Sequence, residues 1–123
     1  MWTPEDGSFG TVVVRIRTLE QLRAEKIGEG PVSTINFPSY ELLYKQFTPT
    51  RLAVLRVMAG AGPLSIREIA RRLDRDFKGV HTDVTTLFRN GFLKKTAEGQ
   101  MIFPYEGIRF EFDVPATNLA AAE

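Results

Sequence analysis

The chain has 123 residues, of which 43% are hydrophobic and 25% are charged, a length and composition typical of a single globular domain. It contains no cysteine and one histidine, His81, which excludes disulfides, cysteine nucleophiles and multi-histidine metal centres. No apolar run approaches the roughly 20 residues of a membrane span, and no signal-peptide pattern is present. We therefore expect a cytoplasmic protein with no membrane segment, no metal and no cofactor.

The charge is distributed unevenly, although the net charge is only +1. Residues 49–95 carry ten basic and four acidic side chains, whereas residues 1–48 and 96–123 are both net acidic. A basic middle segment is typical of a chain that binds a polyanion, but such a cluster can also be a solvated face. The arrangement of residues within the segment has to separate these two interpretations.

The first 36 residues predict one strand and one short helix. Residues 11–18 (TVVVRIRT) alternate between an apolar and a more cationic face, which is the pattern of a strand with one buried side. Residues 19–26 favour a short helix with Thr18 as its N-cap. We assign this part of the chain to a sheet or dimerisation element.

Three segments lack a regular pattern. Residues 1–10 are rich in turn formers, residues 28–38 show no clear periodicity and are interpreted as a linker, and residues 116–123 are a tail. Gly28 and Gly30 are expected to end the short helix that precedes the linker.

Capping signals divide the middle of the chain into consecutive helices. Ser39, Thr48 and Ser65 are N-cap candidates, Pro49 is favoured at the first helical position, and Glu68 completes a capping box with Ser65. Together with the apolar spacing, these signals predict helices over residues 40–47, 49–59, 66–73 and 77–89, the last ended by Gly91 as a left-handed C-cap.

Strand patterns follow these helices. Residues 92–104 predict a β-hairpin with its turn at 97–99, and residues 107–115 alternate as a last strand. The outward face of that last strand is mostly acidic, whereas strand 11–18 has a cationic one. We therefore expect these two strands to pair, either within one chain or between two copies. The residues that suggest this pairing are Arg15, Arg17, Glu111 and Asp113.

A helix, a capped two-turn helix, a short turn, a longer helix and a hairpin make up a winged helix-turn-helix. We therefore predict an α+β fold with a winged helix-turn-helix over residues 37–104. Extra β-strands lie on either side of it, in residues 1–36 and 105–123. In such a fold helix 77–89 reads the major groove of DNA, and hairpin 92–104 acts as the wing.

Helix 77–89 is predicted to bury one side and expose the other. At about 100° per residue, its apolar residues share one direction and its polar residues the opposite one. Threonine is a modest helix former, so hydrogen bonds to base edges and contacts with thymine methyls would explain the exposed threonines; the alternative is a solvated surface. The buried stripe is Phe77, Val80, Val84, Leu87 and Phe88, and the exposed face is Lys78, Gly79, Thr82, Thr85, Thr86 and Arg89.

Two residues of this helix have alternative interpretations. Asp83 fits poorly on a face near phosphates, so it either pairs with a neighbouring arginine or accepts a hydrogen bond from a cytosine amino group. His81 lies at the margin of the core, where a packed, hydrogen-bonded residue is favoured over a phosphate contact. Catalysis would need partner residues that the sequence does not show, so no enzyme activity is expected.

Cations on the neighbouring elements are expected to contact phosphates. Arg71 and Arg72 end helix 66–73, and alternation along the hairpin strand leaves one of Lys94 and Lys95 facing DNA. The full set of expected DNA-binding residues is Arg67, Arg71, Arg72, Arg75, Lys78, Gly79, Thr82, Thr85, Thr86, Arg89, Lys94 and Lys95.

About half of the chain, roughly residues 37–104, resembles a family of small archaeal and bacterial transcriptional regulators. These have a winged helix-turn-helix of the broad MarR/ArsR-like type. The resemblance implies DNA binding and control of transcription, and no metal or ligand site comes with it. The matching motifs are Tyr40-x-x-Leu43, Thr48-Pro49-x-Arg51-Leu52, Ser65-Ile66-Arg67-Glu68, Arg75-Asp76-Phe77-Lys78-x-Val80-His81-x-Asp83-Val84 and Gly91-Phe92-Leu93.

The sequence therefore predicts a sequence-specific regulator that binds double-stranded DNA, without enzyme activity and as a homodimer. The alternative is a winged-helix module that contacts a protein partner and does not read DNA. Cations and hydroxyl groups on the exposed face of helix 77–89 favour the first interpretation, whereas exposed apolar residues there would favour the second.

Overall fold

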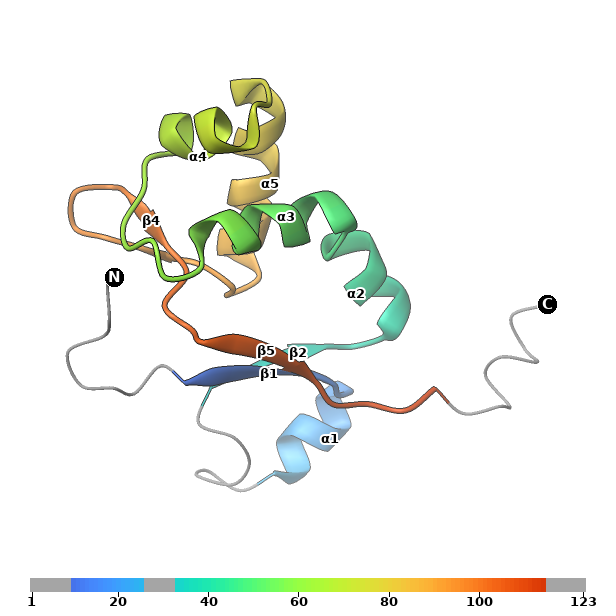
Figure 1. Cartoon of the computed structure of the whole chain (residues 1–123). Helices are drawn as coiled ribbons and strands as arrows, with labels where there is room; N and C mark the ends of the chain where they lie inside the picture. The colour runs from blue at the N-terminus through green and yellow to red at the C-terminus, as the bar shows by residue number, and fades with distance from the viewer. Residues whose placement is uncertain (1–9, 26–32, 115–123) are drawn as a thin grey trace.

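The computed structural model of the chain describes residues 10–25 and 33–114 (Figure 1). Within these ranges it is an α+β protein with five helices, a three-stranded parallel sheet and a two-stranded antiparallel hairpin, so the predicted α+β class is confirmed. The expected irregular residues 1–9, the glycines Gly28 and Gly30, and the tail from residue 115 lie outside the described residues. No helix in the described part is long and apolar enough to span a membrane.

The parallel sheet joins the two ends of the described chain. Its order is β2-β1-β5, with β1 (Thr11–Ile16) in the centre, β2 (Thr34–Phe37) on one side and β5 (Gly107–Phe110) on the other. Val14 of β1 is in register with Ile35 of β2 and with Phe110 of β5. The expected pairing of the N- and C-terminal strands therefore occurs within one chain.

Two sequence-based expectations about this sheet were wrong. Strand β2 lies in the segment interpreted as a linker, because four residues of alternation are too short a signal to recognise. Arg15 and Arg17 form ion pairs with Glu25, the residue after α1 (Leu19–Ala24), and not with the acidic residues that follow β5. These two guanidinium groups lower the pKa of the Glu25 carboxyl, mainly through the hydrogen bond from Arg15.

The sheet lies between a layer of helices and α1 (Figure 1). The helices α2 to α5 cover one face, where the side chains of Val12 and Val14 join the main hydrophobic core and are fully buried. The short helix α1 lies on the other face and is capped by Thr18 as predicted, in a capping box with Gln21. One core therefore connects the sheet to the helices that carry the basic segment.

The helices begin where the capping residues predict. They are α2 (Tyr40–Gln46), α3 (Pro49–Met58), α4 (Ile66–Leu73) and α5 (Phe77–Arg89), and the predicted bounds of α4 and α5 are confirmed. The hydroxyls of Ser39, Thr48 and Ser65 each accept a hydrogen bond from a backbone N–H in the first turn of the helix that follows. Between α4 and α5, Asp74 adopts a left-handed conformation with φ of 52°, which turns the chain sharply.

The predicted hairpin is confirmed as β3 (Lys94–Lys95) paired antiparallel with β4 (Met101–Ile102). Gly99 in its turn has φ of +85°, a conformation that glycine adopts without strain. The backbone of Leu64, in the loop before α4, exchanges two hydrogen bonds of 2.8 Å with Met101. These bonds tie the hairpin to the start of α4, so its position relative to α4 and α5 is defined.

Candidate nucleic-acid interface

Helix α5 presents a polar and cationic face to solvent. Lys78, His81, Thr82 and Arg89 are exposed and Thr85 is half-buried, and we call these five residues the α5 face. Their spacing of three or four residues places them along one side of the helix. The opposite side packs into the core through Val80, Val84 and Leu87, which are fully buried as predicted.

Thr86 does not belong to the α5 face, so the prediction that it is exposed was wrong. It is only 4% exposed and lies on the same side of α5 as Asp83 and Asn90. Both of those residues contact neighbouring helices: Arg51 of α3 pairs with Asp83, and the Asn90 amide donates to Gln46 Oε1 at the end of α2 over 3.1 Å. Contacts with α3 and with the end of α2 therefore occupy this side of α5, which a helical wheel drawn for α5 alone cannot show.

The α5 wheel also misplaced two aromatic residues. Phe77 was expected in the buried stripe but is 42% exposed, because it stands at the first position of the helix. His81 was expected at the margin of the core but is exposed, with its ring centre 5.7 Å from that of Phe77. The imidazole therefore belongs to the solvent-facing surface, and it is the residue of that surface which sequence reasoning missed.

Asp83 is held by two arginines inside the structure. Its carboxylate accepts a hydrogen bond from Arg51 Nε over 3.1 Å and another from Arg75 Nη1 over 2.9 Å. Arg51 also donates to the carbonyl of Gln46 over 2.8 Å, at the end of α2. The expected pairing of Asp83 with an arginine is thus confirmed, and its negative charge is neutralised away from the α5 face.

Arg75 therefore holds α5 in place and is only partly available to a ligand, since its side chain is 31% exposed and bound to Asp83. Gly79 lies close beneath it. A Cβ atom at Gly79 would come within 3.2 Å of both Arg75 Nη2 and the capping carboxylate of Asp76. The glycine thus makes room for the cap and for the Arg75 side chain at the start of α5.

The two arginines at the end of α4 share one carboxylate. Glu68 accepts hydrogen bonds of 2.8 Å from Arg71 Nε and from Arg72 Nε, two consecutive residues that lie about one helical turn after it. These two guanidinium groups lower the pKa of Glu68 from 4.5 to about 2. Arg71 and Arg72 are exposed, as expected of residues that contact phosphates, but both already form ion pairs with Glu68.

Cations from α4 and from the hairpin flank α5 on one side. The guanidinium of Arg67 lies 4.9 Å from the ring centre of Phe77, and Lys95 Nζ lies 5.1 Å from that of Phe88. The rings stand near opposite ends of α5 and on the same side of the helix. Both cations are exposed, and neither makes an ion pair within the described part of the chain.

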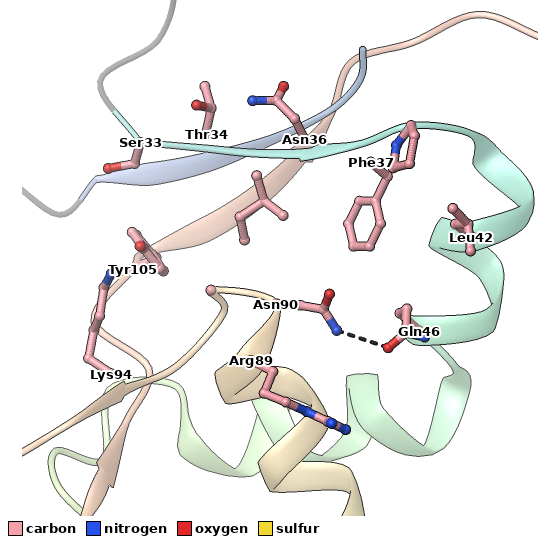
Figure 2. Close-up of a pocket in the computed structure, with 13 residues that line it drawn as sticks. Ser33, Thr34, Asn36, Phe37, Leu42, Gln46, Arg89, Asn90, Lys94 and Tyr105 are labelled. Carbon is pink, nitrogen blue, oxygen red and sulfur yellow. Dashed lines mark hydrogen bonds between the residues drawn. The ribbon is translucent and has the colours of Figure 1, made fainter. Parts of the chain in front are cut away.

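An open groove of about 870 Å³ separates the C-terminal end of α5 from strand β2 (Figure 2). Its cationic residues are Arg89 and Lys94, both exposed and without an ion pair among residues 10–25 and 33–114. Figure 2 shows the hydrogen bond between Asn90 and Gln46 beside the groove. Lys94 and Lys95 are both exposed, as adjacent residues of a two-residue strand whose side chains point to opposite faces of the hairpin.

These features define the chain as an α+β protein whose longest helix exposes a polar, cationic face flanked by basic residues of α4 and the hairpin. The chain belongs to the HVO_A0114 family, whose model matches residues 46–110. The matched segment runs from the last residue of α2 to the last residue of β5 and contains α4, α5 and the hairpin, but not strand β2 beside the groove. Comparisons with curated proteins and with solved structures give no match.

Proposed function

We propose that the protein is a cytoplasmic transcriptional regulator that binds double-stranded DNA specifically through a winged helix-turn-helix of the MarR/ArsR-like type. In this proposal α3, α4 and α5 are the three helices of the motif, and the β3–β4 hairpin is the wing. The α5 helix enters the major groove, and the regulator acts as a homodimer without enzyme activity.

The observation that carries the proposal is the α5 face. Its members are two cations, two hydroxyls and an imidazole, groups that donate to phosphates or to base edges. The only acid of the helix, Asp83, is turned inward and neutralised by Arg51 and Arg75. A face with this composition suits a polyanion, and the flanking Arg67 and Lys95 extend its positive charge.

The residues divide into two roles in this proposal. Lys78, Arg89, Arg67, Lys94 and Lys95 contact phosphates, which positions the protein but carries no sequence information. Thr82, Thr85 and His81 lie between the cations of α5 and contact base edges. In this proposal His81 replaces Thr86 among the residues that contact base edges.

The experiment is a titration of duplex DNA at several salt concentrations, followed by fluorescence anisotropy. Each neutralised phosphate contributes about −0.9 to the slope of log affinity against log salt. Lys78→Ala and Arg89→Ala should each weaken binding to any sequence and reduce the magnitude of the slope by about 1. Arg56→Ala is the matched control, because Arg56 is exposed but lies on α3, away from the α5 face.

Binding that does not depend on salt, or equal losses from Arg56→Ala and Lys78→Ala, would contradict the proposal. The second candidate, a protein-binding module, rests on the exposed ring of Phe77 at the start of α5. An aromatic ring beside a cation is a frequent anchor in protein interfaces. That candidate predicts that Phe77→Ala abolishes capture of the partner while duplex DNA is not bound at all.

A further inference from the structure

Among the described residues, no strand pairs with the outer edge of β5. The sheet order leaves β5 with β1 on one side only. The Glu111 N–H donates to the Val14 carbonyl over 2.9 Å, and peptide groups alternate along a strand, so those of Ile108 and Phe110 point away from β1. They have no backbone partner within residues 10–25 and 33–114. Such an edge is a ready template for an added strand.

An apolar surface lies next to this edge. The Phe110 ring contacts Phe47 with ring centres 5.4 Å apart, yet Phe110 remains 46% exposed. Beside it, a shallow groove of about 270 Å³ runs between α3 and β5. Its apolar lining consists of Leu52, Leu55, Ala59, Phe103, Ile108 and Phe110. An exposed aromatic residue at an open edge above an apolar groove is a surface that association would bury.

The sequence around β5 is complementary to itself when read in the opposite direction. Residues 107–113 are G-I-R-F-E-F-D. If two copies pair antiparallel with Phe110 opposite Phe110, Arg109 lies opposite Glu111 of the second copy, twice by symmetry. Ile108 then lies opposite Phe112 on the face of the groove. Opposite charges placed across a strand pair favour that pairing.

Each neighbouring register places at least one pair of like charges opposite each other, whereas the register centred on Phe110 places none. Free peptide groups must face each other, so the register can change only in steps that preserve the alternation. Centring the pair on Arg109 places two arginines opposite each other. Centring it on Glu111 places Arg109 opposite Asp113 twice, but it also places two glutamates directly opposite each other at the centre. Like charges in those positions oppose pairing. The charges therefore select the register centred on Phe110.

We propose that the β5 edge is the interface through which two copies of this chain form a symmetric dimer with one continuous sheet. Side chains on the groove face of both β5 strands point to the same side of that sheet, so both helical layers lie on one face. The inference names the interface of the homodimer in the proposed function, but its test needs no DNA.

The test is charge reversal measured by sedimentation equilibrium at low salt. Arg109→Glu creates two glutamate pairs across the interface, and Glu111→Arg creates two arginine pairs, so each variant alone should dimerise about tenfold or more weakly than wild type. An equimolar mixture of the two variants should recover dimers, because each interface then pairs two glutamates with two arginines. The double variant Arg109→Glu/Glu111→Arg should also dimerise like wild type.

Arg109 and Glu111 are exposed, and no ion pair involves them in the described part of the chain, so circular dichroism of all variants should match wild type. A wild-type protein that is monomeric at roughly 100 µM, about a hundredfold above a dissociation constant of about 1 µM, would overturn the inference. Dimerisation of both single variants at wild-type strength would overturn it as well. Dimers that do not bind duplex DNA would support the interface and contradict the proposed function. Monomers that bind duplex DNA would contradict the interface and support DNA binding.

Discussion

Asp83 connects the start of α3 with the turn before α5, because its carboxylate binds Arg51 and Arg75. Asp83→Asn keeps the shape of the side chain but removes its charge and leaves both arginines without their acid. We expect the free energy of unfolding to fall by about 1–3 kcal/mol, measured by urea denaturation. Asp113→Asn is the control, since Asp113 is exposed and has no ion pair in the described residues. Equal effects of the two substitutions would contradict this role of Asp83.

Glu68 competes with a polyanion for Arg71 and Arg72. Glu68→Gln removes the carboxylate that holds both guanidinium groups. Two additional cations then become available, so affinity for duplex DNA of any sequence should rise severalfold and the salt slope should steepen. Glu98→Gln, in the exposed hairpin turn, removes the same charge without freeing an arginine. The same rise in both variants would indicate a general charge effect instead.

The lowered pKa of Glu68 also predicts a pH dependence of stability. Because its pKa in the folded protein is about 2, below the ordinary value of 4.5, the contribution of these ion pairs is complete above about pH 4.5. It is lost as the pH falls from there through about 2. Thermal unfolding of wild type and Glu68→Gln should therefore differ at neutral pH and converge across that window. A difference that stays constant down to pH 2 would contradict the assignment.

At the scale of the element, the two sides of α5 have separate roles. Thr82 is exposed at the centre of the α5 face, whereas Thr86 is buried one helical turn later. If α5 reads bases, Thr82→Ala should weaken binding to a selected site by about 1–3 kcal/mol and leave a scrambled duplex nearly unchanged. Thr86→Ala should not distinguish the two duplexes, and its effect should be on stability, about 1 kcal/mol. Anisotropy titrations at one salt concentration, with urea denaturation, check both expectations.

At the scale of the whole molecule, the described part of the chain has one hydrophobic core, shared by the sheet and the helices. Val14 of β1 and Leu87 of α5 are both fully buried in it, although they lie far apart in the sequence. We expect Val14→Ala and Leu87→Ala to lower the same single unfolding transition, by about 2 and 2–5 kcal/mol respectively. Calorimetry checks this, with Leu19→Ala on the exposed side of α1 as the control. Two separate transitions would mean that sheet and helices fold independently.

The helices and the hairpin could be predicted from the sequence because their signals are local. A capping hydroxyl, a proline at the first position and apolar residues every three or four positions act within one or two turns of chain. For that reason the bounds of α4 and α5 agree with the prediction to the residue. Strand β2 could not be predicted from local signals, because its four residues acquire their structure from pairing with β1.

The sequence by itself determined the helical segment, its basic charge and the buried positions Val80, Val84 and Leu87 of α5, since each depends on residue type and short-range spacing. Only the tertiary structure decided which polar residues of α5 remain exposed, because Thr86 is buried on the side of α5 that contacts α3 and the end of α2, whereas His81 is exposed. It also decided that β1 pairs with β5 within one chain. Contacts between residues far apart in sequence settle burial and strand pairing, and no local pattern encodes them.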